Sequence, residues 1–212
     1  MFADQTDVDV ILKNLGCEFG IVRIWFKMFP CVATVQGVID TLAKVIEEHK
    51  ICADDIEVIQ VGISETSLSH GGAIYERHDV ASAQFSLPFS LALRLKNDND
   101  LSLYMDSKLW TDPKVLALAK RVKSYADPKA KGEQNYNRTM EVKLSGGKSV
   151  KAFQQYPPGS PLNPVSRDEL RKKFRKLAGT VLSESRMDQI IEKVDRLETD
   201  DDASELMRLL VK

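Results

Sequence analysis

The stretch Tyr156–Gly179, YPPGSPLNPVSRDELRKKFRKLAG, divides this chain into two parts. Its first half is rich in proline and glycine, which is typical of an extended linker. Ser166 and Glu169 then have the spacing of a capping box, in which each side chain bonds the other residue's backbone N–H. Three apolar residues follow at helical spacing: Leu170, Phe174 and Leu177. Because Gly179 stands where a helix would end, the stretch predicts a linker followed by an amphipathic helix.

The composition is that of an ordinary folded protein. The 212 residues carry a formal net charge of −1, with 43% hydrophobic and 29% charged residues,. A nearly neutral chain has no basic field to attract nucleic acid. No apolar run approaches the ~20 residues that a membrane-spanning helix needs. The first ten residues also lack the basic and apolar regions of a secretory signal. We therefore expect a cytoplasmic protein that binds neither nucleic acid nor membrane.

The cysteines and histidines predict no metal site. The cysteines are three in number and lack CxxC spacing, so we expect reduced thiols: Cys17, Cys31 and Cys52,. The three histidines form no HExxH or paired-ligand pattern: His49, His70 and His78,.

The hydrophobic pattern predicts an α+β fold, with mixed elements up to about residue 155 and only helices afterwards. Strands are expected at Phe19–Phe26 and in the stretch holding Ile56, Val58 and Ile63, and a β-hairpin at Met140–Leu144 and Ser149–Phe153,. Helices are expected at Asp7–Leu15, Pro30–Glu48, Ser86–Leu95, from Asp112 onward, and at Ser166–Ala178, Glu184–Glu198 and Ala203–Val211,. The natural boundary between the two parts is the linker at 156–165.

Lys27 stands at the junction between the first predicted strand and the helix after it. Such a junction exposes free backbone N–H groups and the positive end of the helix dipole, which together favour an anion. A lysine there suits a carboxylate ligand, as counter-charge or, if desolvated, as proton donor. The alternative is a solvated surface lysine. The basic run Arg167–Lys176 reads as the polar face of its helix, directed to water or to acidic groups of a partner.

Four motifs, in the same order, resemble those of the MmgE/PrpD family, which includes 2-methylcitrate dehydratases and cis-aconitate decarboxylases. They are Lys27–Pro30 (KMFP), Ala83–Phe89 (AQFSLPF), Asp112–Leu116 (DPKVL) and the closing PGSPLNP…L..KF..LA. The resemblance covers only the C-terminal half of such an enzyme. It implies a lid-like α+β domain over residues 1–155. The linker and helices of residues 156–212 would be those that pack, in the family, on a helical domain absent from this chain.

The resemblance also implies a site. The family lysine that lines the active site corresponds to Lys27, and by the resemblance Tyr75 would approach the substrate from the lid. Arg77, two residues later, is a candidate to bind a carboxylate of the substrate. For Tyr75 the alternative is a packed ring, and for Arg77 an exposed loop arginine. The implied chemistry is the elimination of water, or decarboxylation, on a small tri- or dicarboxylate, with no cofactor and no metal. Family members are commonly homodimers.

The chain departs from the family after the KMFP motif, where a histidine is usual. Val32–Gln36 stands there, and neither a valine nor an amide can move a proton,. We expect the chain to be inactive by itself and consider three alternatives. It is half of a lyase site completed by a separate helical-domain chain, or a truncated non-catalytic member that binds carboxylates or serves assembly. The third alternative is a stand-alone protein that binds a small molecule near Lys27 and Gly71-Gly72.

Overall fold

The computed structural model describes residues 7–72, 74–76, 78–97, 106–130 and 137–211. Its α-helices are α1 (Val8–Leu12), α2 (Ala33–His49), α3 (Glu65–Ser67), α4 (Val80–Phe85), α5 (Leu87–Asn97), α6 (Ser107–Trp110), α7 (Pro113–Lys120), α8 (Arg167–Ala178), α9 (Glu184–Asp195) and α10 (Ser204–Leu210). Its strands are β1 (Ile56–Ile63), β2 (Val122–Ala126), β3 (Arg138–Leu144) and β4 (Ser149–Gln154). The predicted α+β class is confirmed.

The four strands form one mixed sheet in the order β2-β1-β3-β4. β1 is parallel to β2 and antiparallel to β3, so Ile59 lies between Val122 and Val142. β3 and β4 form the predicted hairpin, and Gly147 in its turn has the positive φ, 78°, that glycine adopts readily,.

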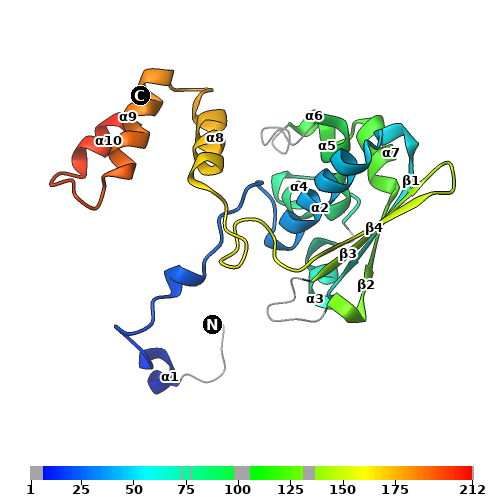
Figure 1. Cartoon of the computed structure of the whole chain (residues 1–212), viewed down its shortest axis with the longest axis horizontal. Coiled ribbons are helices and arrows are strands. Elements are labelled where there is room, and N and C mark those ends of the chain that lie inside the picture. Colours follow the sequence, from blue (N-terminus) through cyan, green and yellow to red (C-terminus); the bar gives the residue numbers. More distant parts are fainter. Residues whose placement is uncertain (1–6, 73, 77, 98–105, 131–136, 212) are drawn as a thin grey trace.

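One face of the sheet is covered by α2, α5 and α7 (Figure 1). The core between these helices and the sheet includes Leu42, Phe89 and Val142, all fully buried. On β4 the exposure alternates, with Lys151 and Phe153 exposed. This alternation is expected of a sheet that packs on one side only.

The helices predicted from Asp7, Asp112 and Ser166 begin where expected, although α1 ends at Leu12 and not at Leu15. The side chain of Asp7 accepts hydrogen bonds at the start of α1, and that of Asp112 does so at the start of α7. Ser166 and Glu169 form the reciprocal capping box of α8, and Gly179 is the residue at which α8 ends.

Helices α8, α9 and α10 lie together, apart from the sheet and joined to it by the linker (Figure 1). α9 packs against both of its neighbours and buries Met187 and Ile190. The basic residues of α8 do more than face water. Arg171 pairs with Asp195 of α9 at 2.5 Å, and Arg175 pairs with Glu184 at 2.7 Å.

Three expectations differ from the structure. Residues 19–26 form no strand, since they lie away from the sheet and include a short 3₁₀ helix, Gly20–Arg23. Their β-branched and aromatic residues favour packing against an apolar surface, and that surface need not be a sheet. The sequence does not reveal β2, because VKSYA is only five residues long and, apart from Val122, lies at least partly exposed. α2 begins at Ala33, three residues after Pro30, because a side chain of α2 holds residues 29–31 in a turn.

We predict that Phe89→Ala lowers the free energy of unfolding by about 3–5 kcal/mol, because the ring is fully buried and its removal leaves a cavity,. Urea unfolding followed by circular dichroism measures this. Phe153→Ala is the control, since that ring is 59% exposed, and we expect its effect to stay within about 0.5 kcal/mol,. Equal losses in the two variants would contradict the placement of the core.

Candidate functional site

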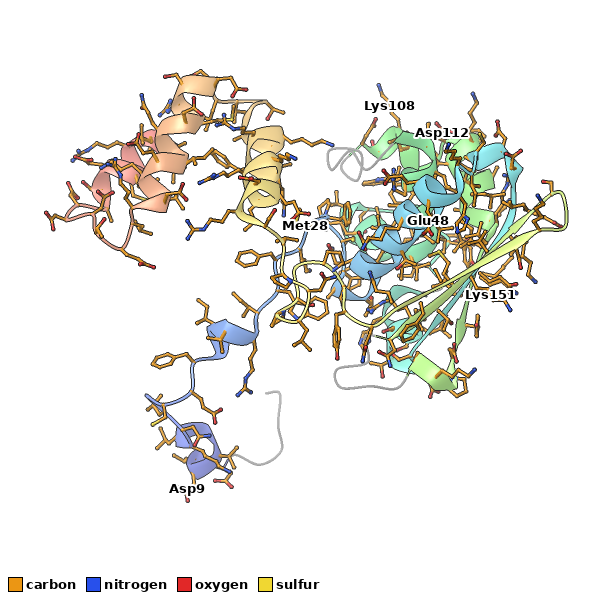
Figure 2. All side chains as sticks on the ribbon, viewed as in Figure 1. Asp9, Met28, Glu48, Lys108, Asp112 and Lys151 are labelled. Atoms are coloured by element: carbon orange, nitrogen blue, oxygen red, sulfur yellow. The ribbon has the colours of Figure 1, made fainter. Side chains whose placement is uncertain are left out.

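Lys27 lies in the chain segment that enters α2, and its side chain is exposed. Residues 24–27 belong to no helix or strand, so other contacts must fix the position of Lys27. Met28, the next residue, marks the place in Figure 2, between α2 and α8. The backbone just after Lys27 is held by α2, and the backbone just before it by the linker.

Gln36 of α2 holds the turn after Lys27. Its Oε1 accepts the N–H of Phe29 at 3.0 Å, and its Nε2 donates to the carbonyl oxygens of Phe29 at 2.7 Å and Cys31 at 3.0 Å. The amide is 2% exposed, so these hydrogen bonds form away from water. From the sequence alone Gln36 was only a residue that cannot transfer protons. The one signal of its role was a polar residue among the buried positions of a helix.

The linker holds the backbone before Lys27. The N–H of Phe26 donates to the carbonyl of Gly159 at 3.0 Å. Gly159 has φ +86°, and a Cβ there would lie 2.0 Å from the Phe26 carbonyl oxygen, so only glycine fits,. From α8, the Lys173 ammonium donates to the carbonyl oxygen of Lys27. The KMFP motif and the closing PGSPLNP…KF motif therefore meet at Lys27.

Tyr75 is connected to the same region through the end of α4. The N–H of Val32 donates to the Gln84 carbonyl at 3.0 Å, and the hydroxyl of Ser86 donates to the Ile74 carbonyl at 2.5 Å. The hydroxyl of Tyr75 itself donates to the carbonyl of Val122 at 2.5 Å, and burial raises the pKa of this phenol. These contacts join the segments of Lys27 and Tyr75 through α4. A substrate contact by Tyr75 stays a prediction, and Arg77 lies outside the described residues.

The chemistry that this arrangement offers is that of an exposed amine on a fixed backbone. The histidines are exposed, and His49 ends α2, which at 17 residues is about 25 Å long,. His49 is therefore far from the end of α2 that meets Lys27. A second amine, that of Lys173, donates a hydrogen bond to the carbonyl of Lys27. Its partial burial lowers the pKa of the Lys173 ammonium. Two cations at one turn favour an anionic ligand.

The described part of the chain holds neither a metal-binding cluster nor a membrane-spanning helix. No three side chains of His, Cys, Asp or Glu gather there in a group that could hold a metal ion. None of the helices described has both the length and the apolar character needed to cross a membrane.

The fold and the site define an α+β domain with an exposed lysine, whose backbone is held by a C-terminal helical segment. Residues 29–198 match the MmgE/PrpD C-terminal domain, and the chain therefore belongs to the MmgE/PrpD family. It is 26% identical over 212 residues to a cis-aconitate decarboxylase of Aspergillus terreus, and 26% identical over 214 residues to the cis-aconitate decarboxylase-like protein oryM of Aspergillus oryzae.

These two alignments cover 94% and 97% of this chain but only 43% and 44% of the relatives. The chain thus spans less than half the length of the curated relatives it matches. The resemblance read from the four motifs is confirmed. Because the family match begins at Phe29, Lys27 lies just outside the matched stretch.

We predict that Gln36→Leu destabilises the fold, because the buried turn groups that Gln36 satisfies lose their partner. Each group left unpaired costs about 1–3 kcal/mol. The measurement is urea unfolding, together with hydrogen exchange at the amide of Phe29, which should quicken. Gln155→Leu is the matched control, since Gln155 is exposed and we expect little change. A Phe29 amide that exchanges as slowly as in the wild type would rule out this role for Gln36.

We predict that Gly159→Ala also destabilises the protein, by at least the roughly 1–2 kcal/mol that a left-handed backbone costs an L-residue. The new methyl group would collide with the Phe26 carbonyl, so exchange at the Phe26 amide should quicken as well. Gly146→Ala is the control, because its Cβ would meet no atom within 4 Å and its φ is not in the left-handed region. The assignment fails if the two alanines are tolerated equally.

Proposed function

We propose that this chain supplies the lysine-bearing part of a cofactor-free lyase site that acts on a small tri- or dicarboxylate such as cis-aconitate. The observation that carries the proposal is the meeting, at Lys27, of two segments far apart in sequence within a domain of the MmgE/PrpD family. The names of the two relatives support the class of substrate. The free cysteines support the cytoplasm as the place of action,.

Lys27 can act on such a substrate in two ways. As an exposed ammonium it is a counter-charge for a carboxylate. When a partner or ligand covers it and removes its water, it can also deliver a proton, and decarboxylation needs a proton at the carbon atom that loses CO₂. The backbone contacts on either side keep the amine in one place for both tasks.

The partner that we propose is a helical polypeptide corresponding to the remaining part of the relatives' length. It would cover the N-terminal apolar segment, defined here as residues 8–26. Nine large apolar side chains of this segment are between 53% and 75% exposed: Val8, Val10, Leu12, Leu15, Phe19, Ile21, Val22, Ile24 and Phe26. An apolar surface of this extent is usual for a protein interface and unusual for free surface.

A second candidate is a non-catalytic family member that retains carboxylate binding or an assembly role. Gln36 favours it, because its amide stands where the motif comparison expects a proton-transferring group and is already engaged with the turn. In this candidate the lysine still attracts carboxylates, but no acid or base acts on them.

We expect the protein isolated from its source to hold the helical part, either as a second chain at fixed stoichiometry or within one longer polypeptide, and to release CO₂ from cis-aconitate. Native mass spectrometry establishes the assembly and a CO₂ assay its activity. Lys27→Ala should lower kcat at least ~100-fold, which is the usual contribution of a proton-transferring residue. Lys148→Ala, in the exposed turn of the hairpin, should leave kcat unchanged.

The alternatives have distinct outcomes. A homodimer of the chain alone, without turnover, would favour the non-catalytic member. A complete assembly whose turnover survives Lys27→Ala would remove Lys27 from the mechanism.

A further inference from the structure

α8 presents two different faces to the rest of the molecule. Arg171 and Arg175 are four residues apart, and both pair with acidic residues of α9. Lys173 stands midway between them, about 200° around the helix from each. Its ammonium therefore points away from α9, and it donates to the carbonyl oxygen of Lys27, 146 residues earlier in the chain.

The contact by Lys173 completes a set of hydrogen bonds around Lys27. The linker holds the N–H of Phe26, and Gln36 holds the N–H and carbonyl of Phe29. Between Phe26 and Phe29, the carbonyl oxygen of Lys27 accepts the hydrogen bond from Lys173 of α8. Since residues 24–27 lie outside any helix or strand, no ladder of backbone hydrogen bonds can take over if this contact is lost.

The physical character of this contact makes it directional and strong. A hydrogen bond from a charged donor is roughly twice as strong as one between neutral groups. Lys173 is partly buried, and burial lowers the pKa of its ammonium, although the Lys27 carbonyl that it contacts lies at the surface. The arrangement also adds a second positive charge beside the side chain that we expect to meet the ligand.

We propose that Lys173 is the positioning residue for Lys27: by holding the Lys27 carbonyl, it fixes the lysine and couples the site to the docking of α8. The role in ligand binding rests on the carboxylate function proposed above, whereas the fixing of the turn does not. The two parts can be tested separately.

The sequence provides a probe for this turn. Lys27-Met28 is the only Lys-Met pair in the chain, so labelling with carbonyl-¹³C lysine and ¹⁵N methionine gives a single carbonyl-to-amide NMR correlation. We expect Lys173→Met, which keeps the length of the side chain but removes the donor, to move this peak by more than its line width. This variant also creates a second Lys-Met pair at positions 172 and 173, and the extra peak is identified by its loss in the double variant Lys172→Arg/Lys173→Met. Lys173→Arg should restore the wild-type position, because arginine also donates. The exposed neighbour gives the control, Lys172→Met, which should leave the peak in place.

Unchanged ¹⁵N signals of the other methionines, including the buried Met140 and Met187, would show that the variants fold. A peak that stays in place in folded Lys173→Met overturns the proposal.

Titration with tricarballylate, a stable tricarboxylate, tests the second part on the same samples. We expect the ligand to move the wild-type peak, and we expect its dissociation constant to rise about tenfold or more in Lys173→Met, as misplacement of a binding group does. Lys173→Arg should recover most of the affinity. Equal affinity in the wild type and Lys173→Met would overturn the positioning role. If the Lys173→Met substitution moves the peak but tricarballylate never moves the peak of the wild type, the fixed turn is supported and the proposed carboxylate function is contradicted.

Discussion

The close packing of α2 on β3 and β4 is the constraint on which the site depends. Gly37 makes it possible, because a Cβ there would lie 1.9 Å from Oε1 of Gln154 and 3.1 Å from Cβ of Pro157. The helix therefore touches both the last strand and the first residues of the linker. At its N-terminal turn the carbonyl of Thr34 accepts Nε of the buried Arg138 at 2.9 Å, which fixes the end of the helix on β3. Gln36, between these contacts, can hold the turn of residues 29–31 only because the helix itself cannot move.

This constraint explains how residues distant in sequence come to share one place. Leaving the sheet beside α2, the linker passes Phe26 at Gly159, and α8 then reaches the carbonyl of Lys27 through Lys173. The position of the lysine thus depends on contacts from the linker and from α8. A backbone that is held in this way is what a binding group requires, since a small misplacement of the group reduces its effect. The side chain of Lys27 stays exposed although its backbone is fixed, so the fixed element is its point of attachment.

The sequence predicted the elements whose signals are local. The Asp112-Pro113 pair gave the start of α7, the capping box gave that of α8, and the turn around Gly147 gave the hairpin. It failed where the cause lies in tertiary contact. Residues 19–26 have the composition of a strand but no strand beside them, and β2 is a strand because β1 lies next to it. For the site, spacing and motif singled out Lys27, but the strand-to-helix junction that they predicted there is absent, because residues 19–26 form no strand and α2 begins only at Ala33. They could not show Gln36, Gly159 and Lys173 around it, because hydrogen bonds to a backbone leave no pattern in the sequence of the partner.

Gln36 also bears on whether the family's chemistry survives in this chain. A histidine at such a position could accept and donate hydrogen bonds and also transfer a proton, whereas an amide retains only the hydrogen bonds. Gln36 therefore maintains the shape of the turn but cannot transfer a proton from that position. For the proposed lyase activity, the remaining proton-transferring groups would have to come from a surface that meets Lys27 from outside. The N-terminal apolar segment leads directly to Lys27 and is largely exposed, so a polypeptide that covers this segment would be carried to the lysine. Burial of the apolar side chains and completion of the site would then be one event, because the same contact that covers residues 8–26 also removes water from the amine.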